Sequence, residues 1–174
     1  MSYKSGMDAN DENGLTQFSA RLRLAVAFLT RLPVEHMPDE DGQLPDPDET
    51  PPTLASAMWL FPLVGFAIGG AGALTLGILV WVGVPAPVAA TLTIGGMIWL
   101  TGALHEDGLS DIADGFGGGG DRDRKLEIMR DSRLGAYGAV TLAVVVITKI
   151  AALATIAAHD VGAAAGALIA ATVW

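Results

Sequence analysis

The stretch LFPLVGFAIGGAGALTLGILVWV, residues 60–82, decides the fold class, because it contains no charged residue over 23 positions. A helix rises about 1.5 Å per residue, so this stretch would form a helix about 34 Å long. The hydrocarbon core of a bilayer is about 30 Å thick. The length therefore predicts a membrane-spanning helix over residues 60–82.

Small residues recur every four positions within this stretch, at Gly65, Gly69, Ala73 and Gly77. Residues with this spacing lie on one side of a helix, and small side chains let a second helix approach closely. The repeat predicts tight helix packing and indicates nothing about catalysis.

Charge is also absent on both sides of this stretch, since residues 50–104 contain no Asp, Glu, Lys or Arg. After a turn at Gly83–Pro85, residues 86–104 predict a second span, and residues 138–158 predict a third. Residues 161–174 are apolar again but too short to cross a bilayer, so we expect a truncated fourth span.

The chain is therefore predicted to be an all-α, polytopic membrane protein with its membrane domain at residues 54–174. Residues 1–17 are polar and are predicted to be a disordered tail. Residues 18–34 carry apolar residues at helical spacing together with arginines, which predicts an amphipathic helix at the membrane surface. Residues 35–53 are rich in acids and prolines, which predicts an unstructured linker.

The composition agrees with a membrane class and excludes two other classes. Hydrophobic residues make up 51% of the chain before its 22 glycines are counted, whereas apolar residues including glycine make up about 45–50% of an ordinary soluble domain. The net charge of −9 argues against nucleic-acid binding. The absence of cysteine excludes disulfides and thiolate chemistry within this chain.

The basic residues predict the orientation of the chain in the membrane. Four of the ten precede the first span, and five lie between the second and third spans. Cytoplasmic segments carry an excess of Lys and Arg. We therefore expect the N-terminus and the polar loop at residues 105–136 to be cytoplasmic.

This polar loop contains the residues that favour chemistry. Asp107, Asp111 and Asp114 are spaced so that they share one side of a helix, while Leu109, Ile112 and Phe116 occupy the other side. Adjacent carboxylates repel one another unless a cation neutralises them. Carboxylate oxygens beside a bound phosphate favour Mg²⁺ as the cation, with Mn²⁺ as the alternative. The simpler interpretation is an acidic, solvated helix face.

Glycines and cations follow the aspartates. The backbone of Gly117–Gly120 can approach phosphate oxygens closely, and Arg122, Arg124 and Lys125 suit a diphosphate. The simpler interpretations are a flexible glycine loop and ordinary ion pairs of Glu127 and Asp131 with neighbouring arginines. Acids, glycines and cations within 20 residues together predict a metal–diphosphate site.

Three stretches resemble a known family. They are FLTRLPV (residues 28–34), FPLVGFAIG (61–69) and GALHEDGLSDIADGFGGGGDRDRKLEIMRDSRLGAYG (102–138). They resemble cobalamin synthase, the adenosylcobinamide-GDP ribazoletransferase family, and the resemblance extends from about residue 17 to the end. It implies a Mg²⁺-dependent enzyme of the bacterial inner membrane that joins adenosylcobinamide-GDP to α-ribazole or its 5′-phosphate and releases GMP, the last step of vitamin B12 nucleotide-loop assembly. Family members continue through further spans.

The resemblance and the loop chemistry together give the expected site. Metal ligands are expected at Asp107, Asp111 and Asp114. Catalytic roles are expected at Asp114, Asp131 and Lys149, with Asp114 as the proton acceptor. Substrate contacts are expected at Gly118, Gly119, Arg122, Arg124, Arg130 and Arg133. Other enzymes of B12 assembly and further copies of the chain are the expected protein partners, beside the lipid bilayer.

Three other functions fit parts of the pattern. A CDP-alcohol phosphotransferase has similar aspartates at the membrane edge, but Ala-Arg is expected soon after its Asp-Gly, where this chain has Phe116 and glycines. A prenyltransferase also binds a metal and a diphosphate. A cation transporter or membrane scaffold would use the aspartates and Lys149 to line an ion path. For Lys149, near the centre of the third span, the alternative to a phosphate contact is an ion pair with an acid of another helix.

Overall fold

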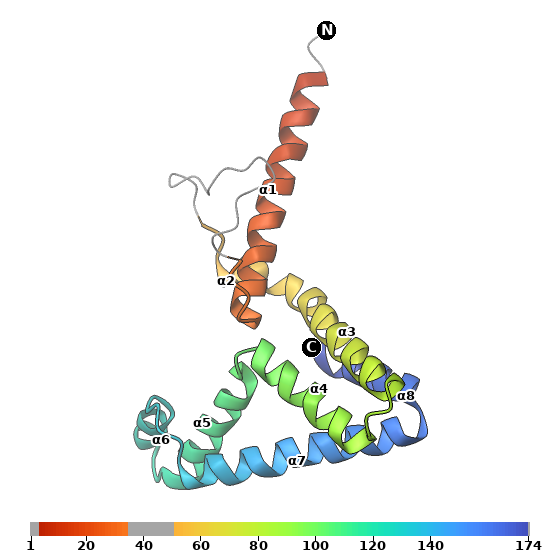
Figure 1. Ribbon diagram of the computed structural model, residues 1–174. Helices are drawn as coiled ribbons and strands as arrows, with labels where there is room; N and C mark the ends of the chain where they lie inside the picture. The colour runs from red at the N-terminus through yellow and green to blue at the C-terminus, as the bar shows by residue number, and fades with distance from the viewer. Residues whose placement is uncertain (1–3, 35–50, 174) are drawn as a thin grey trace.

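The computed structural model describes residues 4–34 and 51–173, with side chains described from Gly14 onward. Every regular element in this part of the chain is a helix, which confirms the predicted all-α class (Figure 1). The helices are α1 (Lys4–Leu29), α2 (Leu54–Ala57), the 3₁₀ turn η1 (Met58–Leu60), α3 (Phe61–Trp81), α4 (Ala86–Leu100), α5 (Leu104–Gly118), α6 (Arg122–Met129), α7 (Ala136–His159) and α8 (Val161–Thr172).

Two helical segments are long and apolar enough to cross a membrane. They are Leu54–Trp81, which joins α2, η1 and α3, and Ala136–His159, which is α7. They confirm the predicted first and third spans. The predicted partial span after Asp160 is the shorter apolar helix α8, whose first turn is capped by the Asp160 carboxylate accepting from the Ala163 amide at 3.0 Å.

The predicted second span at residues 86–104 is wrong as a single helix. α4 ends at Leu100, and α5 starts at Leu104 after a bend of 87°. Gly102 and Ala103 have positive φ angles of 65° and 59°, which turn the chain through this bend. Only α4 and α5 together pass as a third, broken span. The sequence did not mark the break, because residues 101–104 are uncharged and the apolar stretch continues through them.

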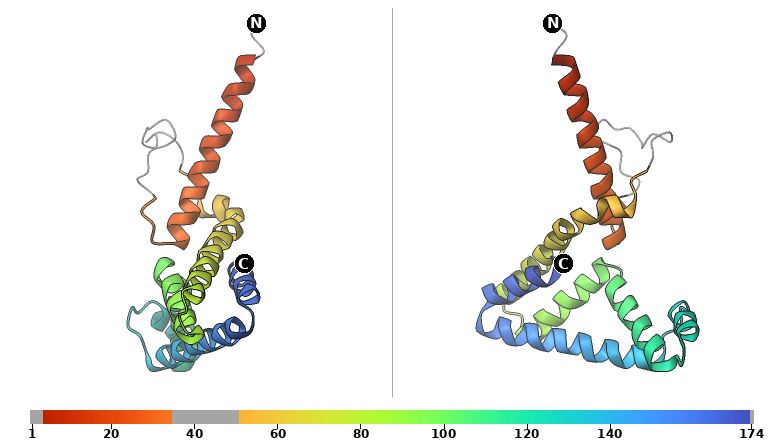
Figure 2. Two further views of the ribbon diagram at one scale, coloured as in Figure 1. Left: turned by 45° about the vertical axis from the view of Figure 1, so that its right-hand side comes forward. Right: turned by 180° about the vertical axis from the view of Figure 1, so that it is seen from behind.

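The bend creates the arrangement that positions the polar residues. α4, α5 and α7 form the three sides of a triangle, while α3 and α8 lie side by side next to α4 (Figures 1 and 2). α5 therefore returns along the first half of α7 instead of continuing the direction of α4.

The core holds the helices together through large aliphatic side chains packed among small residues. Leu76, Ala90, Leu153 and Leu168 come from four different helices and meet in one buried cluster. The predicted close approach is confirmed at the start of the small-residue repeat: a Cβ on Gly65 would lie 1.8 Å from the Thr172 carbonyl oxygen of α8.

The N-terminal helix differs from the prediction in its length. α1 begins at Lys4, within the segment predicted as a disordered tail, and ends at Leu29, inside the predicted helix 18–34. The helix can extend toward the N-terminus because each added residue forms one further backbone hydrogen bond. No proline before Pro33 interrupts it. Residues 35–50 of the predicted linker lie outside the described residues.

The apolar face of α1 packs against protein near its C-terminal end. Ala25 and Leu29 are buried against η1 and α3, and the Phe28 and Phe61 rings stack with centroids 5.7 Å apart. The N-terminal part of α1 projects away from the other helices (Figure 2). Packing also reaches the start of the predicted interfacial helix, because the Phe18 and Trp59 ring centroids lie 5.9 Å apart.

Candidate active site

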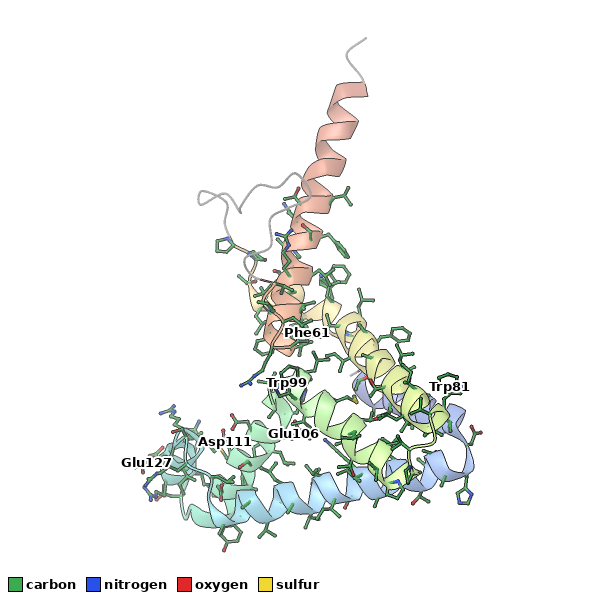
Figure 3. All side chains as sticks on the ribbon, in the orientation of Figure 1. Phe61, Trp81, Trp99, Glu106, Asp111 and Glu127 are labelled. Carbon is green, nitrogen blue, oxygen red and sulfur yellow. The ribbon has the colours of Figure 1, made fainter. Side chains whose placement is uncertain are left out.

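Four of the eight acidic residues of the polar loop lie on α5, which runs between the bend and the start of α7. Glu106 and Asp111 both project from this helix (Figure 3). Asp107 is exposed, Asp111 is half-buried, and Asp114 is buried with 8% of its surface exposed. The α-helix confirms that the three aspartates share one side, but their environments differ.

Asp114 joins α5 to the N-terminus of α7. Its Oδ2 accepts from the Gly135 amide at 2.8 Å, and its Oδ1 accepts from the Gly138 amide at 2.9 Å. A helix N-terminus has amides without intrahelical partners and a positive partial charge, so a carboxylate stabilises it. Asp114 is therefore a helix cap supplied by a different helix, a role that sequence spacing did not predict.

The positions next to this cap must be glycine, because the Asp114 side chain lies too close to their Cα atoms to leave room for a Cβ. A Cβ on Gly138 would lie 2.3 Å from Asp114 Oδ2 and 2.5 Å from Ser110 Oγ, and a Cβ on Gly135 would lie 2.3 Å from Asp114 Oδ1. No side chain fits at either position without moving Asp114. The signal in the sequence that could have indicated this contact is Gly-Ala-Tyr-Gly at residues 135–138, with its two glycines at the start of the third predicted span.

The glycine run after the aspartates packs against neighbouring helices. A Cβ on Gly117 would lie 2.4 Å from the Tyr137 ring, and one on Gly119 would lie 2.5 Å from Lys125 Cγ. Gly118 is the last residue of α5, and the Gly119 amide donates to the Gly115 carbonyl at 3.1 Å. The absence of side chains here lets α5 contact α6 and α7, so packing alone accounts for Gly117 and Gly119.

Lys149 of α7 pairs with Glu106 of α5. Lys149 Nζ lies 3.1 Å from Glu106 Oε1, and the Glu106 side chain is only 12% exposed. This is the ion pair that the sequence left open as the alternative to a phosphate contact. The left-handed turn at Ala103 makes the pair possible, because it directs the first turn of α5 back toward the middle of α7.

α6 carries most of the cations of the loop. Asp121 caps it by accepting from the Arg124 amide at 2.8 Å, the usual role of an aspartate just before a helix. Arg124 pairs with Glu127 at 2.6 Å, so one predicted substrate contact is occupied by an ion pair. Arg122 and Arg130 are exposed and have no acidic partner among the described residues.

Asp131 and Arg133, in the loop before α7, bind each other. Arg133 Nε donates to both Asp131 oxygens at 3.0 Å, and the Arg133 amide donates to Oδ1 at 3.1 Å. The guanidinium bonds, followed by the amide bond, lower the pKa of the Asp131 carboxyl below its ordinary value. The same pair raises the pKa of Arg133.

We expect the Asp131–Arg133 pair to make the loop sensitive to acid. Because the folded pKa of Asp131 is depressed, the pair is fully present above the unfolded pKa of about 3.9 and is lost as the pH falls through the lower folded value. NMR titration of the Asp131 carboxyl carbon should show a midpoint below the ordinary aspartate value of about 3.9, and Arg133→Gln should move that midpoint upward. An Asp131 midpoint at the ordinary value, or one that does not change in Arg133→Gln, would contradict the pairing.

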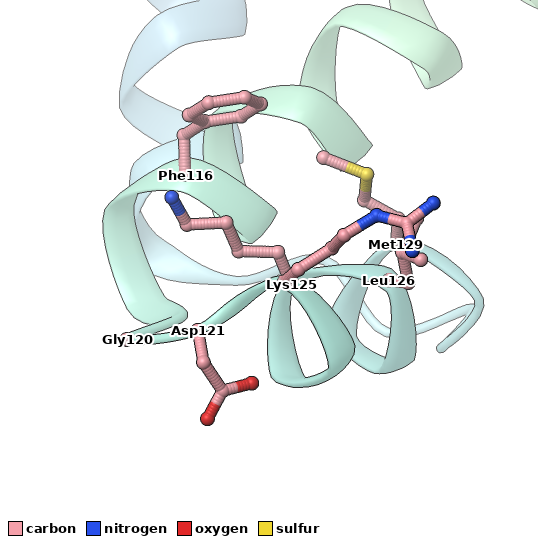
Figure 4. Close-up of a pocket in the computed structure, with 7 residues that line it drawn as sticks. Phe116, Gly120, Asp121, Lys125, Leu126 and Met129 are labelled. Atoms are coloured by element: carbon pink, nitrogen blue, oxygen red, sulfur yellow. The ribbon is translucent and has the colours of Figure 1, made fainter.

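An open pocket of about 310 Å³ lies between the end of α5 and α6 (Figure 4). Its lining includes Phe116, Gly120, Arg122 and Lys125. Lys125 Nζ lies 4.6 Å from the centre of the Phe116 ring, a cation–π contact. The pocket therefore combines two cations with an aromatic surface beside the acidic helix.

The carboxylates of α5 fit a divalent cation only in part. In residues 4–34 and 51–173, no group of three or more His, Asp or Glu side chains is arranged to hold a metal ion. Asp107 and Asp111 lie one helical turn apart and form no ion pair with described residues, whereas both Asp114 oxygens accept amides. Mg²⁺ usually needs only one or two carboxylates when substrate phosphates and water complete its shell. Asp107 and Asp111 fit that smaller donor set.

Comparison with known proteins identifies the family. The family model described as cobalamin-5-phosphate synthase matches residues 21–174. Adenosylcobinamide-GDP ribazoletransferase of Bradyrhizobium diazoefficiens is 45% identical over 139 residues, covering 79% of this chain and 50% of the relative. The protein of the same name from Azorhizobium caulinodans is 47% identical over 147 residues, covering 84% of this chain and 53% of the relative.

The chain spans about half the length of the curated relatives it matches. No solved structure matches it. The matched residues include α5, α6 and α7 completely, and with them the Asp114 cap, the Lys149–Glu106 pair and the pocket between α5 and α6. The family match over residues 21–174 confirms the resemblance, and the chain belongs to the cobalamin-5-phosphate synthase family.

Proposed function

We propose that this protein joins adenosylcobinamide-GDP to α-ribazole or its 5′-phosphate and releases GMP. The observation that carries this proposal is the family match over residues 21–174, which includes the whole acidic and basic site. Relatives of 45% and 47% identity are named for this transfer. The exposed Asp107 and the unpaired Arg122 and Arg130 give the site both charges that a metal-bound diphosphate requires.

The reaction transfers the cobinamide-linked phosphoryl group from the bridging oxygen of the diphosphate to a hydroxyl oxygen of ribazole. A ribazole hydroxyl oxygen forms a bond to the phosphorus on the cobinamide side, the bond from that phosphorus to the bridging oxygen breaks, and the hydroxyl proton is released. Mg²⁺, or Mn²⁺ in its place, would neutralise charge on the diphosphate when bound, and Asp107 and Asp111 are the residues proposed to hold it. Arg122 and Arg130 would bind the phosphate oxygens.

We assign Asp114 a positioning role within this site. Both of its oxygens accept amides from the start of α7, so it fixes the acidic side of α5 relative to the α6–α7 loop. Because each oxygen already accepts a backbone amide, neither is free to accept a hydrogen bond from a substrate hydroxyl. This proposal replaces the expected role of Asp114 as the general base.

The transfer is tested by an exchange of segments, because the relatives are about twice as long. Residues 21–174 replace the matching part of the Bradyrhizobium diazoefficiens relative, and the chimera is incubated in membranes with adenosylcobinamide-GDP, α-ribazole 5′-phosphate and Mg²⁺. We expect equal amounts of GMP and adenosylcobalamin phosphate. A chimera that inserts and folds but forms neither product would contradict the proposal, as would a chimera that conducts cations instead.

Asp111→Asn in the chimera tests the metal-binding proposal. Loss of one anionic ligand should lower kcat/KM at least 100-fold at limiting Mg²⁺ and raise the Mg²⁺ concentration needed for half-maximal activity. Asp123→Asn is the control, since this aspartate is exposed on α6. Similar activity and Mg²⁺ dependence in the two variants would contradict metal binding by Asp111.

We propose a bacterial inner-membrane location with the N-terminus and the α5–α6 region in the cytoplasm. The supporting pattern is that nine of the ten basic residues lie either before the first span or within residues 105–136. The chain has no cysteine, so Ser132→Cys places a single thiol in the loop before α7. This thiol should resist a membrane-impermeant reagent in intact cells and react after permeabilisation. Rapid labelling in intact cells would reverse the proposed topology.

A further inference from the structure

A second open pocket, of about 250 Å³, lies at the bend between α4 and α5. Its lining combines one cation and one aromatic ring with small and aliphatic residues: Arg31, Gly95, Ile98, Trp99, Gly102 and Ala103. Trp99 is 75% exposed, and it lies at the end of α4, across the bend from Glu106 (Figure 3). None of the residues that line this pocket has a role in the metal and diphosphate site proposed above.

The backbone holds Arg31 beside the bend. The Arg31 amide donates to the Leu100 carbonyl at 2.9 Å. The Arg31 side chain lies along Gly102, where a Cβ would be 2.9 Å from Arg31 Nε and 3.0 Å from Arg31 Cγ. Among the residues that the structure describes, the guanidinium has no acidic partner. The pocket therefore contains a cation whose position is fixed and whose charge is not neutralised by the described protein.

The bend lies inside the membrane-spanning region. Glu106, in the first turn of α5, pairs with Lys149 near the middle of α7. Leu100 packs against the buried cluster that includes Ile68, which lies two turns into α3. Ionisable residues at such depth are rare, and they pair with one another or mark the path of a substrate or an ion. Lys149 already neutralises Glu106, so within the described residues Arg31 is the cation at the bend that lacks a counterion.

The chemistry of the pocket favours a phosphate joined to a flat ring. A guanidinium binds phosphate oxygens through two parallel hydrogen bonds, and an exposed aromatic side chain stacks against a base. A phospholipid headgroup supplies a phosphate too, but it would have to enter the membrane to the middle of α7, and it offers no flat ring to the Trp99 indole. The pocket therefore fits an aromatic nucleotide better than a lipid.

The pocket adjoins the proposed metal ligands. Ala103 lines the pocket, and its carbonyl accepts from the Asp107 amide at 2.8 Å, so Asp107 lies one helical turn from the pocket. One turn of a helix rises about 5.4 Å, a distance that the ribose of a nucleotide can bridge. A nucleotide with its phosphate on Arg31 can thus direct its ribose hydroxyls toward the acidic side of α5.

We propose that the pocket at the bend binds the acceptor of the transfer, with the phosphate of α-ribazole 5′-phosphate on the Arg31 guanidinium and its base against Trp99. This inference rests on the proposed function, from which it takes the acceptor. It goes beyond that function by making Arg31 the residue that selects the phosphorylated acceptor over α-ribazole itself.

Binding to the complete chain tests this site without requiring turnover. The chain is reconstituted in phosphatidylcholine nanodiscs with Mg²⁺, and its affinities for α-ribazole 5′-phosphate and α-ribazole are measured by calorimetry. We expect the phosphorylated ligand to bind about tenfold more tightly or better, because hydrogen bonds between charged groups are strong. Arg31→Gln should remove most of this difference, and Arg31→Lys should keep part of it. Trp99→Leu should weaken the binding of both ligands by a similar factor.

Arg21→Gln is the matched control, because Arg21 lies on the same N-terminal segment, contacts Gln17 and does not line the pocket. It should keep the preference of the parent chain. Equal affinities of the parent chain for the two ligands, binding of neither, or an unchanged preference in Arg31→Gln would overturn the acceptor site. Loss of the phosphorylated ligand in nanodiscs that contain phosphatidylglycerol would assign Arg31 to a lipid headgroup and would overturn it as well.

The chimera distinguishes failure of this site from failure of the proposed transfer. In an active chimera, Arg31→Gln should lower kcat/KM for α-ribazole 5′-phosphate about tenfold more than kcat/KM for α-ribazole. An active chimera without this difference would overturn the acceptor site and leave the transfer standing. An inactive chimera together with Arg31-dependent binding by the chain would contradict the transfer and support the binding site.

Discussion

Replacing Gly138 by alanine is expected to destabilise the protein by about 3 kcal/mol, since the new Cβ disrupts hydrogen bonds to a charged group that are each worth about 1.5–3 kcal/mol. The Cβ would lie 2.3 Å from Asp114 Oδ2 and 2.5 Å from Ser110 Oγ, far inside contact distance. Asp114 must then move away from the start of α7, and the Gly135 and Gly138 amides lose their acceptor. For a chain of this size the midpoint of thermal unfolding should fall by roughly 6–12 °C.

A matched control separates this effect from the general cost of replacing glycine. A Cβ on Gly120 would have nothing within 4 Å, and this glycine belongs to the same loop region, so Gly120→Ala should change the midpoint little. Asp114→Ala should lower the midpoint about as much as Gly138→Ala, and the double variant should lose no more than either alone, because both changes break the same contact. Full additivity, or equal midpoints for the Gly138 and Gly120 variants, would show that the cap does not stabilise the junction.

Replacing Lys149 by methionine is expected to destabilise the α5–α7 contact before it affects chemistry. Methionine keeps the chain length but removes the cation that pairs with Glu106, whose side chain is only 12% exposed, whereas the Lys149 side chain is 48% exposed. Losing the partner of a largely buried carboxylate is costly, because that charge is left without its ion pair. Lys149→Met should therefore unfold at a lower temperature in detergent and accumulate at a lower level in the membrane.

The double variant Glu106→Gln with Lys149→Met distinguishes an ion pair from two independent roles. Removing both charges should recover much of the stability, with a coupling energy of about 0.5–3 kcal/mol. Lys125→Met is the control, because Lys125 contacts the Phe116 ring and has no buried acidic partner among the described residues. If Lys149→Met is as stable as the parent chain but loses activity, Lys149 contacts substrate; if it is both stable and active, the pair has neither role.

Long-range contacts explain which site predictions needed the structure. The ion pairs within a few residues, Glu127 with Arg124 and Asp131 with Arg133, followed from short spacings. Asp114 was grouped with Asp107 and Asp111 because helix periodicity places the three on one side of a helix. Periodicity does not predict what that side contacts. Its partners, Gly135 and Gly138, are 21 and 24 residues away and use backbone amides, which carry no side-chain signal.

Local composition was sufficient to predict that this protein is an all-α membrane protein. Long uncharged stretches require helices that satisfy their own backbone hydrogen bonds in lipid, so the lengths of residues 60–82 and 138–158 alone predicted spans there. The family resemblance likewise depended on contiguous residues. The bend at Gly102 and Ala103 depended on tertiary contacts, because it is held where the Arg31 amide donates to the Leu100 carbonyl at 2.9 Å and where Lys149 reaches Glu106. A left-handed backbone in a non-glycine residue is unfavourable in isolation, so contacts between residues far apart in the chain had to fix the direction of α5 and with it the position of the acidic site.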